Sequence, residues 1–401
     1  MGLSLLVTRP VRAQEPPEPI TDNHYNIDIA PGPVMGSSRT MGLAGAYTSI
    51  AEGTETLYYN PAGLAIKRKW SRSYWDWDWA ADWFLTGLFG GVDFENNGSG
   101  TAEENRSFLA LDLGTSFRVG RVGLGALFRM RRYTIDTEDH PRLEVRSIKV
   151  PIGLAVALFE DQLSLGLDAV WQFLNLNDTD QGDKLVGFSG ATAGLSALYR
   201  PRKLPFRLGL SAVLPGMSVR DAGGSAEGDP LAVRGIILPQ GVAIPWSLTG
   251  GISFCSSKAP YNYPRPKSVT PTESALSEEP EPPRRYLLVS MDVEVIGSSK
   301  NATGLEAFIR QERQPAGESA TISPRLGVES EVVENWLRLR GGTYYEPSRF
   351  TGVEGRWHGT GGFDLRLFET HVLVDAVWKV SAAMDAARNY TNLGLSVGWW
   401  H

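Results

Sequence analysis

Apolar and polar residues alternate along most of the chain beyond residue 68. Over segments of roughly 9 to 17 residues, one parity is apolar and the other carries the charges, which is typical of membrane β-strands. In 162–174, for example, Leu165 and Trp171 share one parity, whereas Asp168 and Gln172 share the other. The pattern predicts strands with one apolar face and one polar face.

Counting such segments predicts fourteen strands. Their ranges are 67–79, 107–119, 121–134, 143–159, 162–175, 185–200, 205–216, 244–255, 286–298, 320–333, 335–346, 357–369, 371–383 and 389–401. A further segment, Gly304–Arg310, would make the count odd, so we assign it to a loop. The register near 217–256 is the least defined part of this prediction, because a long connection falls there on a side where short turns are expected.

Alternation alone also fits a soluble β-sandwich, so other features must decide. The predicted strands are long, and aromatic residues gather near their ends, as at Trp75, Trp77, Tyr344 and Tyr345. The final segment, Tyr390–His401, alternates and ends in two tryptophans and a histidine. Aromatic residues at strand ends are typical of the two interfaces of a membrane barrel. No run of eighteen apolar residues occurs that would indicate a transmembrane helix.

A glycine-rich stretch precedes the alternating region. Residues 36–64 contain small residues and finish with the motif Tyr58-Tyr-Asn-Pro-Ala-Gly-Leu64. Gly42, Gly45 and Gly63 permit close backbone approach or positive φ, and Pro61 fixes a turn. The alternative is an ordinary glycine-rich loop. The stretch resembles the N-terminal hatch of the FadL/PorV-like outer-membrane β-barrels, closely over about thirty residues.

The resemblance implies an all-β fold, a transmembrane antiparallel β-barrel of fourteen strands with an N-terminal hatch segment inside it. It implies three parts, namely a signal peptide at 1–13, the hatch at 14–66 and the barrel at 67–401. The apolar run at the start is short and lacks a basic region, so we expect the true start codon to lie upstream. The resemblance also implies location in the bacterial outer membrane, contact with outer-membrane lipid, and insertion by the barrel-assembly machinery. His401 departs from the terminal aromatic residue that this machinery recognises.

Composition excludes several classes of function. The net charge is −6 and the basic residues are dispersed, which argues against nucleic-acid binding. Cys255 is the single cysteine, and the five histidines lie far apart, so no metal site, cofactor or enzyme motif is predicted.

Two sets of candidate site residues follow from the resemblance and the alternation. In the implied hatch, Asn60, Pro61, Ala62 and Gly63 form the turn that anchors the hatch to the first strand. On the inward parity lie charges that either line a permeation path or, as we favour, pair across the lumen and hold the barrel shape. These inward residues include Asp112, Arg129, Arg131, Asp168, Asp292, Arg338, Arg340, Asp364 and Arg366.

A third candidate is the apolar connection 80–94, whose apolar residues have helix-like spacing. These residues are Trp83, Phe84, Leu85, Leu88 and Phe89. They either capture apolar ligands at the outer rim or, as we favour, merely cover the rim.

The leading functional hypothesis is passive uptake of hydrophobic small molecules, such as long-chain fatty acid-like or aromatic compounds, without a cofactor. The alternative is a PorV-like docking protein that binds secreted proteins or partner subunits and transports nothing. The long polar connections 217–243 and 256–284 favour docking, and the apolar 80–94 segment favours uptake. A third possibility is a barrel with a structural role only.

Overall fold

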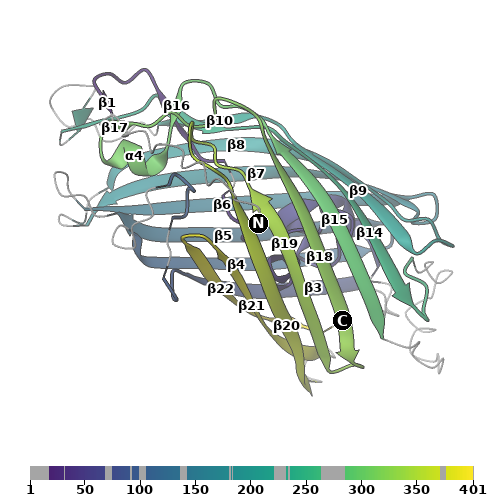
Figure 1. Ribbon diagram of the computed structural model, residues 1–401. Coiled ribbons are helices and arrows are strands. Elements are labelled where there is room, and N and C mark those ends of the chain that lie inside the picture. Colours follow the sequence, from purple (N-terminus) through teal and green to yellow (C-terminus); the bar gives the residue numbers. More distant parts are fainter. Residues whose placement is uncertain are drawn as a thin grey trace, which may run out of the picture.

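The chain forms a closed antiparallel β-barrel with part of its N-terminal segment inside the lumen (Figure 1). The computed structural model describes residues 18–30, 32–67, 75–90, 93–98, 105–135, 142–179, 182, 184–220, 232–233, 235–262, 285–370 and 376–400. The predicted signal peptide, the start of the predicted first strand, the acidic part of the 256–284 connection and His401 lie outside these residues.

Fourteen barrel positions are occupied, which confirms the predicted strand number. In chain order they are β3 (Trp75–Thr86), β4 (Asn105–Val119), β5 (Val122–Ile135), β6 (Leu143–Leu158), β7 (Leu163–Asp178), β8 (Lys184–Tyr199), β9 with β10 (Phe206–Val213 and Gly216–Arg220), β13 with β14 (Gly241–Ile244 and Ser247–Ser257), β15 (Tyr286–Ile296), β18 (Thr321–Val333), β19 (Leu337–Glu346), β20 (Arg356–Thr370), β21 (Ala376–Ala387) and β22 (Tyr390–Trp399). The last strand, β22, pairs with the first, β3, so the sheet closes on itself.

Two neighbouring strands are interrupted at prolines. The break at Pro215 separates β9 from β10, and the break at Pro245 separates β13 from β14. The breaks lie side by side, because Val213 pairs with Ser247 and Gly216 pairs with Ile244. Proline cannot donate to a β-ladder, so each break divides one long strand into two. The poorly defined register near 217–256 therefore falls on two barrel strands that are each divided at a proline.

The alternation places apolar side chains outside and polar ones inside. On β7, Leu167 and Trp171 are 50% and 43% exposed, whereas Asp168 and Gln172 are 8% and 2% exposed. An exposed apolar belt of this kind is the surface that a transmembrane barrel presents to lipid. The barrel is therefore of the outer-membrane type, as predicted.

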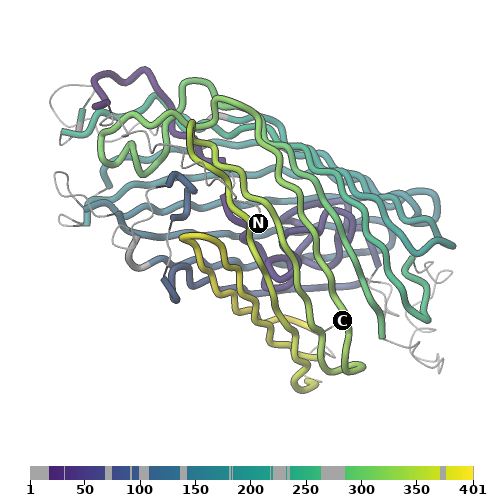
Figure 2. The backbone as a smooth tube through the Cα atoms, in the orientation of Figure 1, coloured from purple at the N-terminus to yellow at the C-terminus, as the bar shows by residue number. Residues whose placement is uncertain are grey.

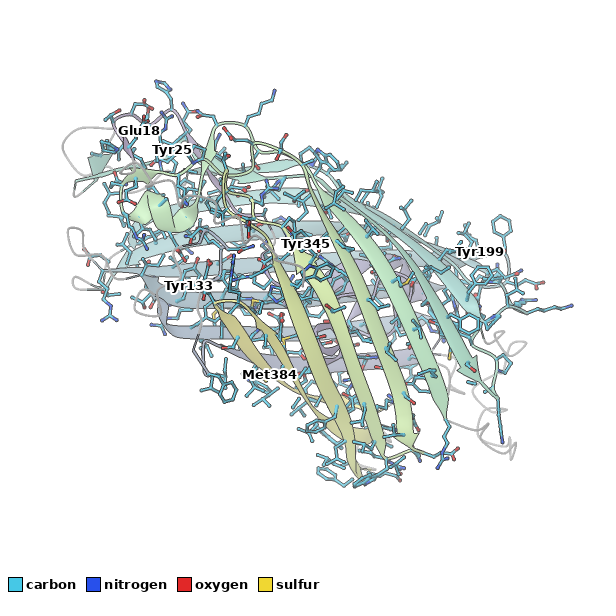
Figure 3. The ribbon with its side chains drawn as sticks, viewed as in Figure 1. Glu18, Tyr25, Tyr133, Tyr199, Tyr345 and Met384 are labelled. Atoms are coloured by element: carbon cyan, nitrogen blue, oxygen red, sulfur yellow. The ribbon has the colours of Figure 1, made fainter. Side chains whose placement is uncertain are left out.

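The two rims of the barrel differ. One rim, here called the short-turn rim, carries the turns at 120–121, 159–162, 200–205 and 334–336. The other, the loop rim, carries most of the longer connections, which include the short helix α4 (Leu305–Ile309) and the strands β16 (Ala302–Thr303) and β17 (Glu312–Arg313). The long connection from β14 to β15 is the exception, because Ser257 and Tyr286 pair at the short-turn rim. Tyr25 lies at the loop rim and Tyr199 at the opposite end (Figure 3). Aromatic pairs mark both ends, Trp77 with Trp399 at the short-turn rim and Tyr345 with Trp357 at the loop rim.

The N-terminal segment runs from the loop rim into the lumen (Figure 2). At the rim, β1 (Glu18–Pro19) pairs with β17, and β2 (Asn26–Asp28) runs parallel to both β13 and β16. The chain then forms three short helices, α1 (Ser38–Gly42), α2 (Thr56–Tyr59) and the 3-10 helix η1 (Pro61–Ala65). The segment thus lies across the rim before it enters the lumen.

A further small pair of strands is β11 (Ala232–Val233) with β12 (Ile236–Ile237).

The structure corrects the prediction for the start of the 80–94 connection. Residues up to Thr86 continue β3, so the helix-like spacing does not reflect a helix there. Trp83 is 39% exposed on the outer face, whereas Phe84 is fully buried. Phe84 faces the hatch, where a methyl group at Gly394 would contact both Phe84 and Met41. Because this strand is apolar on both faces near its end, it lacks the alternation that marks the others.

The predicted loop assignment of Gly304–Arg310 is confirmed, since this segment contains α4 and no barrel strand.

Candidate functional site

The hatch, defined here as residues 36–66, packs its backbone directly on glycines of the barrel wall. A methyl group at Gly123 would lie 2.0 Å from Leu64 O, and one at Gly166 would lie 2.4 Å from Ala62 N. These glycines belong to β5 and β7, and both face the lumen. Only a residue without a Cβ admits such an approach. The glycines of the wall therefore determine where the hatch can lie.

The hatch turn is held by the side chain of Asn60. Its Nδ2 donates to Thr48 O at 2.7 Å and to Ala197 O of β8 at 3.1 Å. Its Oδ1 accepts from Ala62 N, which also donates to Ser196 Oγ. The four predicted turn residues thus surround the start of η1. These contacts attach the turn to β8, a different strand from the first one named in the prediction.

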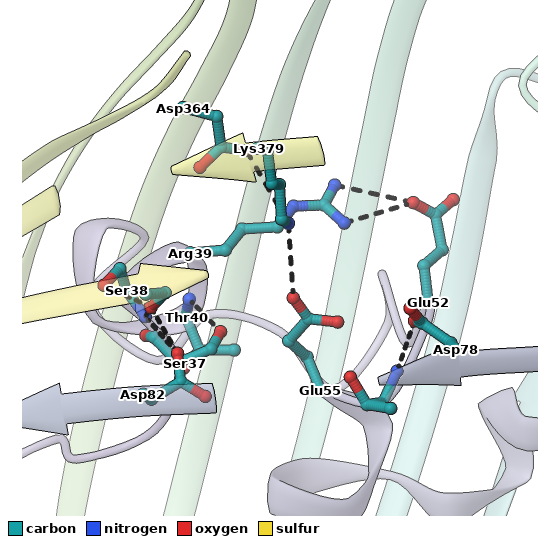
Figure 4. A network of polar contacts seen from close by, with 12 residues as sticks. Ser37, Ser38, Arg39, Thr40, Glu52, Glu55, Asp78, Asp82, Asp364 and Lys379 are labelled. Atoms are coloured by element: carbon teal, nitrogen blue, oxygen red, sulfur yellow. Dashed lines mark hydrogen bonds and ion pairs between the residues drawn. The ribbon is translucent and has the colours of Figure 1, made fainter. Parts of the chain in front are cut away.

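Ion pairs link the hatch to the wall. Figure 4 shows one such link, in which Lys379 of β21 lies between Glu55 of the hatch and Asp364 of β20, and it also shows Arg39 beside Glu52. A second link, a chain of ion pairs, runs through Arg39. Arg39 of the hatch binds Glu329 of β18, with Nη2 and Oε1 2.8 Å apart, and Glu52, with Nη2 and Oε2 3.4 Å apart. Glu329 also accepts from Arg340 Nε at 3.0 Å. Arg340 in turn binds Asp364 of β20 through two hydrogen bonds, at 2.7 and 2.6 Å. Displacing the hatch would break the contacts of Arg39 and leave Glu329 with one cation fewer.

Glu52 is the hatch carboxylate that joins this chain to a second strand. Arg207 of β9 donates through Nη1 to Glu52 Oε1 at 2.8 Å. Burial alone would raise the pKa of Glu52, but the Arg207 and Arg39 guanidiniums outweigh it and lower this pKa to about 2. The carboxylate is therefore ionised at neutral pH and binds one arginine of the hatch, Arg39, and one of the wall, Arg207.

A cavity of about 320 Å³ lies between the hatch and the loop rim. Its wall combines apolar groups with polar ones from several strands, a mixture typical of ligand sites. The apolar side includes Met35, Tyr58, Phe94, Tyr133, Leu174 and Val213, and the polar side includes Arg129, Arg131, Ser147, Lys149, Gln172 and Arg325. A smaller cavity, of about 100 Å³, lies near the ion-pair chain and is lined by Arg39, Glu55, Arg207 and Lys379 among others.

At the loop rim, Glu95 lines the large cavity. Its carboxylate accepts from the backbone N–H groups of Leu305 and Glu306 at the start of α4, at 3.0 and 3.3 Å. Burial, together with the nearby Glu306 carboxylate, raises the pKa of Glu95 well above its usual range. The loop that carries Glu95 is thus attached to α4 through hydrogen bonds, and none of the described cations pairs with this carboxylate.

Most of the predicted lumen charges form ion pairs. Arg131 binds Asp112 through two hydrogen bonds, at 2.5 and 3.1 Å, and Arg129 Nε lies 3.4 Å from the same carboxylate. Arg338 binds Glu331 at 2.9 Å, and Arg340 binds Asp364 as described above. These pairs support the structural role expected for inward charges.

Three predicted charges behave differently. Asp292 accepts from the hatch amide Thr48 N at 2.8 Å, so it contacts the hatch rather than a cation. For Asp168, no ion pair occurs within the described part of the chain. Arg366 pairs with Glu369 close to the short-turn rim, away from both cavities.

The predicted capture residues do not form a single surface. Trp83 points outward and Phe84 inward on β3, while Leu88 and Phe89 are exposed in the turn that follows, at 55% and 64%. Ligand capture at the rim remains a proposal for Leu88 and Phe89 only.

Two features of the site were not identified from the sequence. Lys149 lines the large cavity. Alternation can place a cation on the inner face of a strand, but it does not show whether a carboxylate pairs with that cation. His358 lies between Glu346 and Asp385, at 2.8 Å from each, and Tyr344 stacks on its ring. The hydroxyl of Tyr344 accepts from Val34 N, so this group also holds the N-terminal segment. The sequence pattern that could have identified this group is that His358, Tyr344 and Glu346 all lie at inward-facing positions of two paired strands.

No helix in the described part of the chain is long and apolar enough to cross a membrane. Among the same residues, no group of three or more His, Cys, Asp or Glu side chains is placed to hold a metal ion.

Comparison with solved structures shows which fold this is. The CymD monoaromatic hydrocarbon channel superimposes with a TM-score of 0.53 at 15% identity, covering 91% of this chain and 96% of that one. The toluene transporter TodX of Pseudomonas putida superimposes with a TM-score of 0.53 at 13% identity, covering 90% and 97%. No protein-family model and no curated protein sequence matches the chain. The chain thus shares the fold of these channels, which confirms the FadL-like fold expected from the sequence.

Proposed function

We propose that the protein is a passive outer-membrane channel for hydrophobic small molecules. The observation that carries the proposal is the cavity of about 320 Å³ between the loop rim and the hatch. It is large enough for a small organic ligand, and apolar side chains such as Phe94, Leu174 and Val213 line part of it. The shared fold with channels described as carrying toluene and monoaromatic hydrocarbons supports this assignment.

The proposed route begins at the loop rim, where Leu88 and Phe89 are exposed, and continues into the large cavity. From there the ligand must pass the hatch, which fills the lumen. The route needs no cofactor or energy source, because the ligand moves down its own concentration gradient. Passage therefore depends on movement of the hatch away from the wall.

The test is to fix the hatch to the wall by a reversible cross-link. Ser49 Oγ of the hatch and Ser290 Oγ of β15 lie 3.4 Å apart, a separation compatible with a disulfide after Ser49→Cys and Ser290→Cys. The background carries Cys255→Ser, which removes the single native cysteine. We expect proteoliposomes to take up toluene when the cross-link is reduced and to lose most of this uptake when it is oxidised.

A matched control joins two wall strands instead. Ser253 of β14 pairs directly with Ser290, so Ser253→Cys with Ser290→Cys uses the same wall position without the hatch. Oxidation of this control should leave uptake unchanged. Equal uptake by the oxidised and reduced forms of the hatch cross-link, or no uptake by any form, would contradict the proposal.

A further inference from the structure

An arginine pair lies on the lipid-facing side of the barrel, at the edge of the apolar belt. Arg132 of β5 and Arg146 of β6 are directly opposed in the ladder between these neighbouring strands (Figure 1). Directly opposed residues of an antiparallel pair have Cβ atoms about 5 Å apart. The two side chains are 50% and 42% exposed, whereas the residues on either side of Arg132, Arg131 and Tyr133, line the large cavity inside the barrel. The two guanidiniums therefore face away from the lumen.

Strand geometry gives the height of this pair in the membrane. The outward positions of β5 are apolar from Val122 at the short-turn rim to Met130, and Arg132 is the next outward residue. Arg132 lies ten positions beyond Val122. Ten residues of a strand cover about 34 Å, which a tilt of about 40° reduces to roughly 26 Å, close to the height of the apolar band of a barrel. The pair thus lies where the hydrocarbon ends and the headgroups begin, on the side of the loop rim.

The same boundary crosses three neighbouring strands. The last apolar row consists of directly paired outward residues of β5, β6 and β7, namely Met130, Ile148 and Phe173. The next row towards the loop rim consists of Arg132, Arg146 and Asn175. A row of hydrogen-bond donors therefore lies directly beside an apolar row. A lipid molecule presents its headgroup and its acyl chains in the same order.

The charge of the pair is only half balanced among the described residues. Glu144 of β6 accepts from Arg132 Nε at 2.6 Å and from Arg146 Nη2 at 3.3 Å, so one carboxylate serves two guanidiniums. Arg146 Nε is buried and has no hydrogen-bond partner in the described part of the chain. Like charges directly opposite each other destabilise a sheet, so a further anion beside the pair would stabilise this arrangement.

The position of the pair indicates which anion this is. The longer connections of an outer-membrane barrel are extracellular, so the loop rim lies in the outer leaflet. That leaflet consists largely of lipid A, a glycolipid that carries phosphate groups on a sugar headgroup. Guanidinium forks bind phosphate through parallel charge-assisted hydrogen bonds. A soluble anion would match the two arginines but would make no use of the apolar row beside them.

We infer that Arg132 and Arg146 form a binding site for a phosphate group of lipid A on the outer surface of the barrel. The acyl chains lie along the apolar row of β5, β6 and β7, and Asn175 lies beside Arg146 where its amide can bond to the sugar headgroup. The site lies outside the lumen, so it does not depend on the proposed channel function. Hydrogen bonds to charged groups contribute roughly ten- to a hundredfold in affinity.

The experiment measures lipid binding to the purified protein in mild detergent by native mass spectrometry. EDTA is present, so that no divalent cation can bridge the protein and a phosphate. The probes are bisphosphorylated lipid A, the same glycolipid without its phosphates, and phosphatidylglycerol. We expect bisphosphorylated lipid A to bind roughly tenfold or more tightly than either of the others, and inorganic phosphate not to displace it.

Three results would overturn the inference. Equal binding of the phosphorylated and unphosphorylated glycolipids would show that the phosphate is not recognised. Equal binding of phosphatidylglycerol would show a general contact with anionic lipid. Displacement of lipid A by inorganic phosphate at a similar concentration would show a site for free anions.

Variants then assign the preference to the arginine pair. Arg132→Gln together with Arg146→Gln should weaken binding of bisphosphorylated lipid A roughly tenfold and leave binding of the unphosphorylated form unchanged. Arg132→Lys together with Arg146→Lys keeps the charge and a partner for Glu144 but loses the forks, so its binding should lie between that of the native protein and that of the Gln pair. Faster migration of unheated protein on a denaturing gel checks that each barrel is folded.

The matched control removes two exposed cations at the opposite rim. Arg121→Gln together with Lys203→Gln makes the same change in charge at the short-turn rim and should leave lipid A binding unaltered. Equal weakening by this control and by the Gln pair would assign the effect to net charge and overturn the inference. Full retention of lipid A binding by the folded Gln pair would overturn it as well.

Discussion

Gly209 of β9 and Thr48 of the hatch are in direct backbone contact. A methyl group at Gly209 would lie 2.1 Å from Thr48 O and 2.5 Å from Thr48 C. Asp292 of β15, two strands away from β9 along the wall, accepts from Thr48 N at 2.8 Å. The backbone of Thr48 thus packs closely against Gly209, which has no side chain, and its N–H group donates to the Asp292 carboxylate. The hatch position is determined by the wall as much as by its own sequence.

Gly209→Ala should therefore displace the hatch. The added methyl group meets backbone atoms, which cannot move aside as a flexible side chain can, so the hatch must shift. We expect faster hydrogen exchange of hatch amides and increased cleavage by protease in the variant. Gly250→Ala is the matched control, because Gly250 pairs with Leu210 on the neighbouring strand and has nothing within 4 Å of its would-be methyl group. Similar behaviour of the two variants would show that the close contact is unimportant.

The side chain of Asn60 should stabilise the hatch through its donors. Asn60→Ala leaves the carbonyls of Thr48 and Ala197 without these donors, and we expect a loss of about 1–3 kcal/mol in hatch stability. Asn60→Asp keeps the oxygen that caps η1 but places a carboxylate oxygen next to the two carbonyls. Hydrogen exchange should show a larger loss for Asn60→Asp than for Asn60→Ala. The opposite order would mean that the capping contact to Ala62 dominates.

The N-terminal segment should separate from the loop rim when its ion pair is removed. Asp28 is buried and binds Arg349 Nε at 2.6 Å, with Ser299 Oγ donating to it at 2.8 Å. Arg349→Met leaves a buried carboxylate without its cation, a change that typically costs about 3–5 kcal/mol. We expect faster hydrogen exchange of the β2 amides. Lys300→Met changes an exposed cation on the same rim and should leave this exchange unaltered.

Acid should loosen the hatch through Glu52. The pKa of Glu52 is lowered to about 2 in the folded state, against about 4.3 in an unfolded chain. A carboxylate with a lowered pKa contributes stability above its unfolded pKa, and this stability is lost as the pH falls towards the folded value. We expect hatch protection from proteolysis to decline between about pH 5 and pH 2.

Glu52→Gln isolates that effect. The variant should show reduced protection already at pH 7, because Arg39 and Arg207 lose a shared carboxylate, and a smaller further decline with acid. An unchanged acid profile in Glu52→Gln would assign the pH dependence to other carboxylates.

The sequence alone determined the strands and their inward and outward faces. Alternation is a local property, since the side chains of successive residues point to opposite faces of a sheet. Gln172 and Asp112 were therefore placed in the lumen correctly, and the hatch motif was identified from its own residues. The same reasoning failed at Phe84, where burial against the hatch makes the inner face apolar and removes the alternation.

Only the tertiary structure decided which inward residues are neighbours. Arg129 and Lys149 lie 20 positions apart in the sequence, and Gln172 lies 23 beyond Lys149, yet strand register places the three in one row. Likewise, nothing in the local sequence of Gly209 indicates that Thr48 packs on it. Register and barrel closure are set by contacts summed over the whole sheet, and a shift of two residues keeps every side chain on its face while changing every partner. The chemistry of the lumen depends on those partners, so it becomes visible only in the closed barrel.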